Sequence, residues 1–237
     1  MVGTLINVGM ILAGSCAGIS VGSRFPERIR EIVLQGLGLL TLLVGMQMAL
    51  QTKNILIVLG AVLMGGITGE VLRIQDGLEG LGAFFQKKLA GKSPSGHGTH
   101  FAEGFVTASL VFCIGPMAIL GSIQDGLSGD YRLLAIKSIL DGFASIAFSA
   151  SLGWGVSLSV VSVFLYQGGI TLFAELFSRI LTDSMIVEMT AAGGLIIVGI
   201  GLKLLSVKEI RLASFLPALV VAPALVALIP TFKSFFD

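Results

Sequence analysis

Long apolar segments alternate with short polar ones along almost the whole chain. Runs of about twenty mostly apolar residues, each long enough to cross a bilayer as a helix, recur eight times. Backbone amides in lipid must be satisfied within the segment, and the runs are longer than the strands of a membrane barrel. The pattern therefore predicts an all-α polytopic membrane protein with about eight transmembrane helices. Their expected ranges are about 4–22, 32–50, 55–72, 104–122, 133–150, 154–177, 186–205 and 212–230.

The composition agrees with this pattern. Of the 237 residues, 54% are hydrophobic and 12% are charged, and the mean hydropathy is +0.97. A soluble domain carries roughly 25% charged residues, so this chain cannot cover itself with a water-facing surface. The net charge is +1, and no run of Lys and Arg is long enough to follow a phosphate backbone. We therefore expect the lipid bilayer as partner, exclude nucleic acid, and interpret residues 1–237 as a single transmembrane domain.

One polar connection is longer than the others and divides the chain. Residues 73–103 begin with an amphipathic pattern, and Gly91 to His100 has the composition of a flexible linker. The alternate loops on the side of this linker carry ten Lys and Arg residues, and those on the other side carry four. The positive-inside rule then places the linker in the cytoplasm and both termini outside.

Small residues and Ser-Arg pairs recur at similar spacing near the two ends of the chain. We interpret residues 1–72 and 154–230 as two repeat-like units that flank a central helix pair at 104–150. Corresponding spans of the two copies are five spans apart, an odd number, so the copies would insert in opposite orientations, as inverted repeats of secondary transporters do. Chance recurrence in a glycine-rich membrane protein is the alternative. Ser23-Arg24, Gly38 and Gly45 align with Ser178-Arg179, Gly194 and Gly201, and Gly14 aligns with Gly169.

Two places inside the apolar runs are expected to interrupt a helix. Gly115-Pro116 lies in the middle of the fourth run, where proline removes an amide and clashes with the preceding turn. Gln167-Gly168-Gly169 lies in the middle of the sixth run. A carbonyl freed at membrane depth must meet protein, water or an ion. The sequence therefore predicts two interrupted helices that could form a binding site.

Asp141 is the strongest candidate for chemistry because it lies at the centre of the fifth run. An ionised carboxylate there costs roughly 2.5 to 3.5 kcal/mol on insertion scales, so it requires a partner or a proton. Ser138 and Ser145 share its helix face, and Lys137 lies one turn earlier. A Lys-Asp clamp that fixes packing is one interpretation. A cation or proton site with Lys137 as counter-charge is the other, and we favour it.

Hydroxyls, amides and loosened carbonyls near Asp141 are ligands for a monovalent cation or a small polar solute rather than a soft transition metal. Asp125 follows Gln124 in Ile123-Gln-Asp-Gly-Leu127, which repeats the segment at 74–78. A helix C-terminal turn and contact with an ion are the two explanations, and we favour the turn for Asp76 and leave both open for Asp125. We expect no metal site and no cofactor. The candidate ligand- or ion-binding residues are Asp141, Lys137, Ser138, Ser145, Cys113, Gly115, Pro116, Gln124, Asp125, Tyr166, Gln167 and Gly168.

No enzyme signature is present in the sequence. The chain has no Walker loop, no Rossmann glycine fingerprint and no Ser-His-Asp set in a suitable context. We therefore expect that the protein is not an enzyme and does not drive transport with a nucleotide of its own.

Several segments resemble one family of membrane proteins. Residues 105–130, Lys137-Ser-Ile-Leu-Asp-Gly142, Leu152-Gly-Trp-Gly-Val156 and Tyr166-Gln-Gly168 are similar to the YqgA-type bacterial inner-membrane proteins, a family of unknown function. The resemblance covers nearly the whole chain and implies a multi-pass protein of the bacterial plasma membrane. It supplies no substrate. It marks Cys113, Gly115, Pro116, Gln124, Asp125, Asp141 and Gln167 as matching the family's motifs.

Three functional hypotheses follow from these residues. The first is a secondary transporter of a small solute or ion, coupled to Na⁺ or H⁺, with a midplane site at the helix breaks. The second is a channel-like pore that uses the same polar face. The third is a structural or regulatory membrane protein without flux. The small-residue helix faces also leave a homodimer open.

Overall fold

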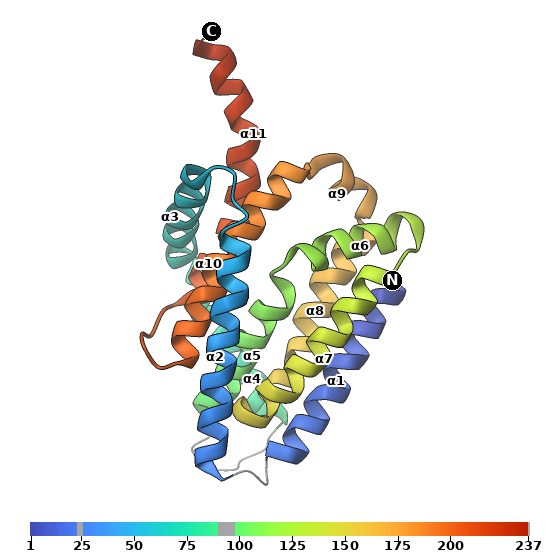
Figure 1. The fold of residues 1–237 in the computed structure, drawn as a ribbon, viewed down its shortest axis with the longest axis vertical. Coiled ribbons are helices and arrows are strands. Elements are labelled where there is room, and N and C mark those ends of the chain that lie inside the picture. The colour runs from blue at the N-terminus through green and yellow to red at the C-terminus, as the bar shows by residue number, and fades with distance from the viewer. Residues whose placement is uncertain (23–25, 90–97, 237) are drawn as a thin grey trace. The chain divides into compact units, whose positions relative to one another are not determined.

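The computed structural model describes residues 1–22, 26–89 and 98–236, and these contain helices but no strand (Figure 1). The predicted all-α fold is confirmed. The helices are α1 (Val2–Gly22), α2 (Glu27–Ala49), α3 (Ile55–Val71), α4 (Ile74–Leu89), α5 (Gly98–Cys113), α6 (Pro116–Ser128), α7 (Arg132–Leu152), α8 (Gly155–Leu172), α9 (Ala174–Ile180), α10 (Asp183–Leu204), the 3₁₀ helix η1 (Leu212–Phe215) and α11 (Ala218–Phe236).

Five helices in the described ranges are long and apolar enough to cross a membrane by themselves: α1, the part of α2 from Glu31 to Ala49, α7, α8 and α10. Two bent pairs, α3 with the start of α4 and α5 with α6, bring the number to seven if each pair forms one span. A shorter apolar helical segment, Leu212–Leu228, covers the eighth predicted run. The expectation of about eight spans is consistent with this arrangement.

The interruption predicted at Gly115-Pro116 is confirmed. Helix α5 ends at Cys113, α6 begins at Pro116, and the two helices meet at an angle of 62°. Proline forces this break locally, because it lacks the amide hydrogen that the next helical turn requires.

The interruption predicted at Gln167-Gly168-Gly169 is wrong. Helix α8 runs without a break from Gly155 to Leu172. Glycine weakens a helix but keeps its amide, so the hydrogen-bond ladder can continue when neighbouring helices support it. The second bent pair is α3 with α4, which meet at 56° across a turn that contains Arg73, a residue with φ of 52°.

The long polar connection is more ordered than its composition suggests. Its amphipathic beginning forms α4, in agreement with the spacing of its apolar residues. Helix α5 already begins at Gly98, so the linker expected up to His100 is wrong at its end. Residues 90–97 lie outside the described residues, and the cytoplasmic location of the connection stays a prediction.

The chain divides into two compact units. Unit 1 comprises residues 1–37, 76–113 and 117–177, and unit 2 comprises 38–75, 114–116 and 178–237. The expected single domain and the expected repeat boundaries are not tested by this division, and they stay predictions. Each unit is described separately below.

In unit 1, helix α1 packs closely against α7. Gly14, Gly18 and Gly22 recur at every fourth position of α1 and face the α7 backbone. A Cβ atom on these glycines would lie 2.3, 2.2 and 2.4 Å from the carbonyl oxygens of Gly142, Ile146 and Ala150. Only glycine permits this approach, which places the two backbones in direct contact in the manner of small-residue motifs in membranes.

In unit 2, helices α2 and α10 also cross at glycines. A Cβ atom on Gly45 would lie 2.8 Å from the carbonyl oxygen of Gly194, and one on Gly194 would lie 2.7 Å from that of Gly45. In the same way, a Cβ atom on Gly38 would lie 3.3 Å from the carbonyl oxygen of Gly201, and one on Gly201 would lie 2.9 Å from that of Gly38. The sequence thus specifies two matched points of contact between these helices.

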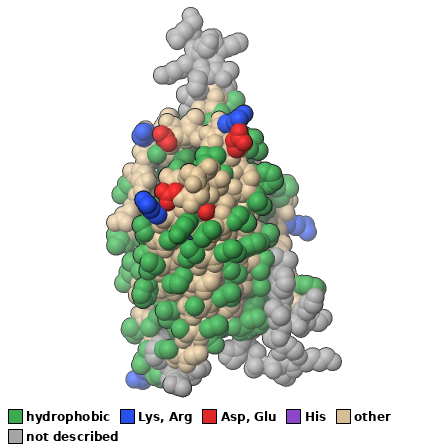
Figure 2. Space-filling model, turned by 90° about the vertical axis from the view of Figure 1, so that its right-hand side faces the viewer, with side chains coloured by type: hydrophobic (Ala, Val, Ile, Leu, Met, Phe, Trp, Pro, Cys, Tyr) green, Lys and Arg blue, Asp and Glu red, His purple; other side chains and the backbone are tan. Residues whose placement is uncertain are grey.

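Large apolar side chains cover much of the surface. Figure 2 shows hydrophobic side chains crowded over the visible face. On α7, Leu140 and Phe143 are 57% and 68% exposed, and Leu165 on α8 is 67% exposed. Such side chains would be costly in water but match the acyl chains of a bilayer.

Candidate functional site

A buried ion pair lies at the middle of α7. The side chains of Lys137 and Asp141 are one helical turn apart, and the Lys137 ammonium donates to Oδ2 of Asp141. Both residues are buried, with relative exposures of 6% and 8%. Spacing of four residues places them on the same helix face, and neither charge could be buried alone without a large desolvation cost. The pairing predicted from the sequence is confirmed.

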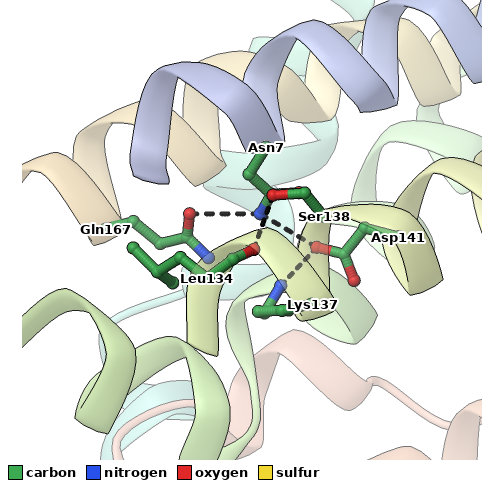
Figure 3. A network of polar contacts seen from close by, with 6 residues as sticks. All are labelled: Asn7, Leu134, Lys137, Ser138, Asp141 and Gln167. Atoms are coloured by element: carbon green, nitrogen blue, oxygen red, sulfur yellow. Dashed lines mark hydrogen bonds and ion pairs between the residues drawn. The ribbon is translucent and has the colours of Figure 1, made fainter. Parts of the chain in front are cut away.

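Asn7 joins this ion pair to two further helices. It lies on α1, is fully buried, and donates through Nδ2 to Oδ2 of Asp141 at 3.0 Å and to Oε1 of Gln167 at 3.1 Å. Figure 3 shows the Asn7 amide between Gln167 on α8 and Asp141 on α7. One amide group therefore connects α1, α7 and α8 within unit 1.

The orientation of both amides follows from the charge of Asp141. An ionised carboxylate only accepts hydrogen bonds, so Asn7 must turn its NH₂ group toward it. The second hydrogen of that group then requires the carbonyl oxygen of Gln167. As a consequence, Oδ1 of Asn7 and Nε2 of Gln167 are buried without a hydrogen-bond partner in the part of the chain that the structure describes.

The serines of the predicted polar face are buried but bond to backbone. Ser138 donates to the carbonyl oxygen of Leu134 at 2.6 Å, within its own helix. Ser145 donates to the carbonyl oxygens of Gly142 and Ile11, at 2.8 and 3.2 Å. These serines therefore stabilise α7 and its contact with α1, and no hydrogen bond joins them to Asp141 among the described residues.

Cys113 on α5 lies near the ion pair, and Tyr166 on α8 lies near Cys113. Ser109 donates to Ser162 at 3.0 Å, and the next turn of each helix carries Cys113 and Tyr166. Cys113 lies within range of the charges of Lys137 and Asp141, and Tyr166 lies within range of Cys113. The structure thus brings Cys113 to the neighbourhood of Asp141 and Tyr166 to that of Cys113, and no hydrogen bond joins either residue to Asp141 in the described part.

Gly168 lies beside α1 instead of at a helix break. It is buried, and a Cβ atom added to it would meet nothing closer than Cε of Met1 at 3.7 Å and Cγ2 of Thr4 at 4.0 Å. The helices are therefore less tightly packed here than at the glycines of α1.

The comparisons with known proteins agree with this membrane architecture. A family model described as "Protein of unknown function (DUF554)" matches residues 2–227. The chain belongs to the DUF554 family. It is 30% identical over 236 residues to the "Uncharacterized membrane protein YdfK" of Bacillus subtilis (strain 168), a match that covers 98% of each chain. It is 29% identical over 227 residues to the "Uncharacterized protein YqgA" of Escherichia coli (strain K12), covering 96% of this chain and 97% of that one. No solved structure matches. The resemblance to the YqgA-type proteins is confirmed.

Other predicted site residues of this DUF554 protein lie elsewhere in it. Asp125 on α6 is buried and accepts from the backbone amide of Gly3 at 3.0 Å and from the amino group of Met1 at 2.9 Å, so it caps the start of α1. Gln124 is exposed. Gly115 and Pro116 belong to unit 2, so their participation in a site with Asp141 stays a prediction.

One buried acidic residue of unit 2, Glu188, serves as a structural anchor. Glu188 on α10 is only 3% exposed and accepts from the hydroxyl of Thr52 and from the backbone amides of Lys53 and Asn54. Its carboxylate thereby fixes the turn that precedes α3. In the described ranges, no group of three or more His, Cys, Asp and Glu side chains could hold a metal ion.

Asn7 is the residue that sequence reasoning missed. Its signal was present, because it is the only amide or charged side chain in the first apolar run. The predicted site rests on carboxylates and helix breaks, and a lone amide near the start of a span is neither. Its role depends on two partners more than 130 positions away.

Proposed function

We propose that this DUF554 protein is a secondary transporter of a small solute or ion in the bacterial inner membrane, coupled to H⁺ or Na⁺. The observation that carries the proposal is the buried Lys137–Asp141 pair, tied through Asn7 to Gln167 on a third helix. Apolar side chains of similar volume often hold helices together as well as a buried ion pair or better. Ionisable groups inside a membrane are rare and typically mark ion or solute pathways.

The two glycine contacts in unit 2 support the inverted repeat that such transporters commonly contain. The sequence alignment equates Gly38 with Gly194 and Gly45 with Gly201. Exchanging the two copies converts the contact Gly38–Gly201 into Gly194–Gly45, which is the other contact observed. This reciprocity is what a pseudo-two-fold axis between α2 and α10 would produce. It adds a spatial argument to a sequence match of small residues.

Protons fit the ion pair better than Na⁺ does. Lys137 already occupies a position at the Asp141 carboxylate, so Na⁺ would have to displace the ammonium or add an unbalanced charge. When the Lys137–Asp141 pair loses or gains a proton, its net charge and its hydrogen bonds change, and no further ion has to be coordinated. We therefore place H⁺ before Na⁺ as the coupling ion, and we assign the chain neither enzymatic activity nor a cofactor.

Reconstitution into proteoliposomes tests the proposal. Wild-type vesicles, Asp141→Asn vesicles and empty vesicles are given a mixture of small metabolites with and without an imposed pH gradient, and accumulated solutes are identified by mass spectrometry. The wild type should accumulate at least one solute in a saturable, gradient-dependent manner, and Asp141→Asn should lose this by about 10-fold or more, because it loses an ion pair that acts in the membrane interior.

Asp130→Asn is the matched control, because Asp130 is an exposed acid in the loop before α7. It should transport like the wild type. Identical solute profiles for the wild type, both variants and empty vesicles would contradict transport. A lower melting temperature of Asp141→Asn in that case would favour the structural clamp, which the direct Lys137–Asp141 bond also fits.

A further inference from the structure

Four unpartnered polar atoms gather between α1 and α8. They are Oγ1 of Thr4, Oδ1 of Asn7, Nε2 of Gln167 and Oγ1 of Thr171, and each is buried without a hydrogen-bond partner in the described structure. The four residues are 0 to 5% exposed. Buried polar groups in folded proteins almost always have a partner, so four in one region call for an explanation.

Two of these residues lie on α1 and two on α8, and we call the contact between these helix faces the α1–α8 seam. Thr4 and Asn7 lie one turn apart on α1, and Gln167 and Thr171 lie one turn apart on α8. The hydrogen bond between Asn7 and Gln167 and the approach of Gly168 to Thr4 show that these two helix faces meet. The seam begins beside the ion pair of α7 and extends toward the start of α1.

The seam is looser than the neighbouring helix contact. A Cβ atom on Gly168 would have nothing nearer than 3.7 Å, although the residue is buried. On the opposite part of α1, a Cβ atom at Gly18 would lie 2.2 Å from the backbone of α7. A methyl group would therefore fit at Gly168 in the seam, whereas none fits at Gly18 in the contact between α1 and α7.

The free atoms of the seam are electrically neutral. Lys137 and Asp141 cancel each other, and what remains is an amide oxygen, an amide NH₂ group and two hydroxyls. An ion at this position would introduce an unbalanced charge into an apolar interior, whereas an uncharged molecule would not. The bound molecule must donate to Oδ1 of Asn7 and accept from Nε2 of Gln167.

We propose that the α1–α8 seam binds a small uncharged molecule that both donates and accepts hydrogen bonds, the chemistry shared by primary amides and short polyols. The inference rests on the proposed function, because it names the class of the transported solute. It also gives Asn7 a coupling role. The same Nδ2 group bonds to Asp141 and to Gln167, so neutralising Asp141 would free the Asn7 amide to turn and would change the donors and acceptors of the seam.

Binding to the purified full-length protein in detergent tests this inference. The probes are acetamide, which donates and accepts, N,N-dimethylacetamide, which only accepts, and glycerol as the polyol. Affinities are measured by ligand-observed NMR titration. Acetamide or glycerol should bind saturably, and N,N-dimethylacetamide should bind about 10-fold more weakly, because it leaves one buried acceptor without a donor.

Thr171→Val is the informative variant, and Thr190→Val is its matched control. Thr190 on α10 is also buried with an unpartnered hydroxyl, but it belongs to unit 2. Valine has nearly the shape of threonine, so neither change should lower the melting temperature of the protein without probe. Thr171→Val should weaken acetamide or glycerol binding about 5- to 10-fold, and Thr190→Val should leave it unchanged.

Equal binding of all three probes, or equal effects of the two variants, would overturn the inference and leave water as the occupant of the seam. The outcomes that would contradict the proposed function are different from those that would contradict binding at the seam. If uptake depends on the gradient and on Asp141 but no probe binds specifically, only the binding site at the seam is refuted. Specific binding without uptake by the wild type would refute transport and retain the binding site. The probe with the higher affinity distinguishes amides from polyols as the solute class.

Discussion

The two halves of α1 show two different ways of packing a helix inside a membrane protein. Toward its end, Gly14, Gly18 and Gly22 bring its backbone against that of α7. Toward its start, Thr4 and Asn7 place polar side chains against α8, and one side-chain oxygen of each has no partner in the described structure. The glycine half packs its backbone against α7 and leaves one buried hydroxyl, that of Ser15, without a partner in the described structure. The polar half leaves two such atoms, and its contact with α8 at Gly168 has more room. We infer that the glycine turns mainly serve packing, and that the proposed binding site uses the polar turns near the start of α1.

Among the changes that test this comparison, removing one charge of the ion pair should lower the free energy of unfolding the most. Lys137→Met leaves Asp141 buried without its cation, so we expect a loss of about 3 to 5 kcal/mol in the free energy of unfolding. The double variant Lys137→Met/Asp141→Leu should recover most of the loss, because no isolated charge remains. Unfolding by denaturant in detergent micelles measures both values. If the double variant is as unstable as the single one, the ion pair stabilises the fold by more than cancelling its own two buried charges.

Filling the tight half of α1 should have the next largest effect. Gly18→Ala puts a Cβ atom 2.2 Å from the carbonyl oxygen of Ile146, so the helices must separate at a cost of about 1 to 3 kcal/mol. Gly9→Ala on the same helix is the control, because nothing lies within 4 Å of the added atom. It should leave the melting temperature unchanged or raise it, since alanine favours helix. Equal melting temperatures for the two variants would contradict the close contact.

Removing the amide of Asn7 tests the polar half. Asn7→Leu eliminates the hydrogen bonds to Asp141 and Gln167, and we expect a loss of about 1 to 2 kcal/mol in unfolding free energy. In proteoliposomes, the same variant should reduce gradient-dependent uptake more than Gly18→Ala does at a temperature where both are folded. If the two variants lose uptake only in proportion to their stability, the halves of α1 do not differ in function.

The smallest effect is expected at Ser138. Its hydroxyl bonds to the carbonyl oxygen of Leu134 in the same helix and to nothing in the site, in the part of the chain that is described. Ser138→Ala should change unfolding free energy by less than about 1 kcal/mol and leave uptake unchanged. A loss of uptake comparable to that of Asp141→Asn would instead show that Ser138 takes part in the binding site, as the sequence predicted.

Features that depend on neighbours along the chain were predictable. The break at Pro116 follows from a missing amide, which no tertiary contact can restore. The Lys137–Asp141 pair follows from four-residue spacing on one helix. Glycine behaves differently, because it permits several backbone conformations and enforces none. At Gly168 the sequence could not decide between a break and a close neighbour, and the prediction of a break was wrong.

The amino-acid sequence by itself determined that this DUF554 protein is an all-α membrane protein with a buried charge pair, because hydrophobic length and helical spacing are local properties. The tertiary structure alone decided that Asn7 and Gln167 complete the surroundings of Asp141, and that Ser138 and Ser145 bond to backbone carbonyls instead. Hydrogen bonds between residues more than 130 positions apart depend on which helix faces meet. That choice is made by the packing of α1 between α7 and α8, where glycine sets one contact and polar side chains set the other.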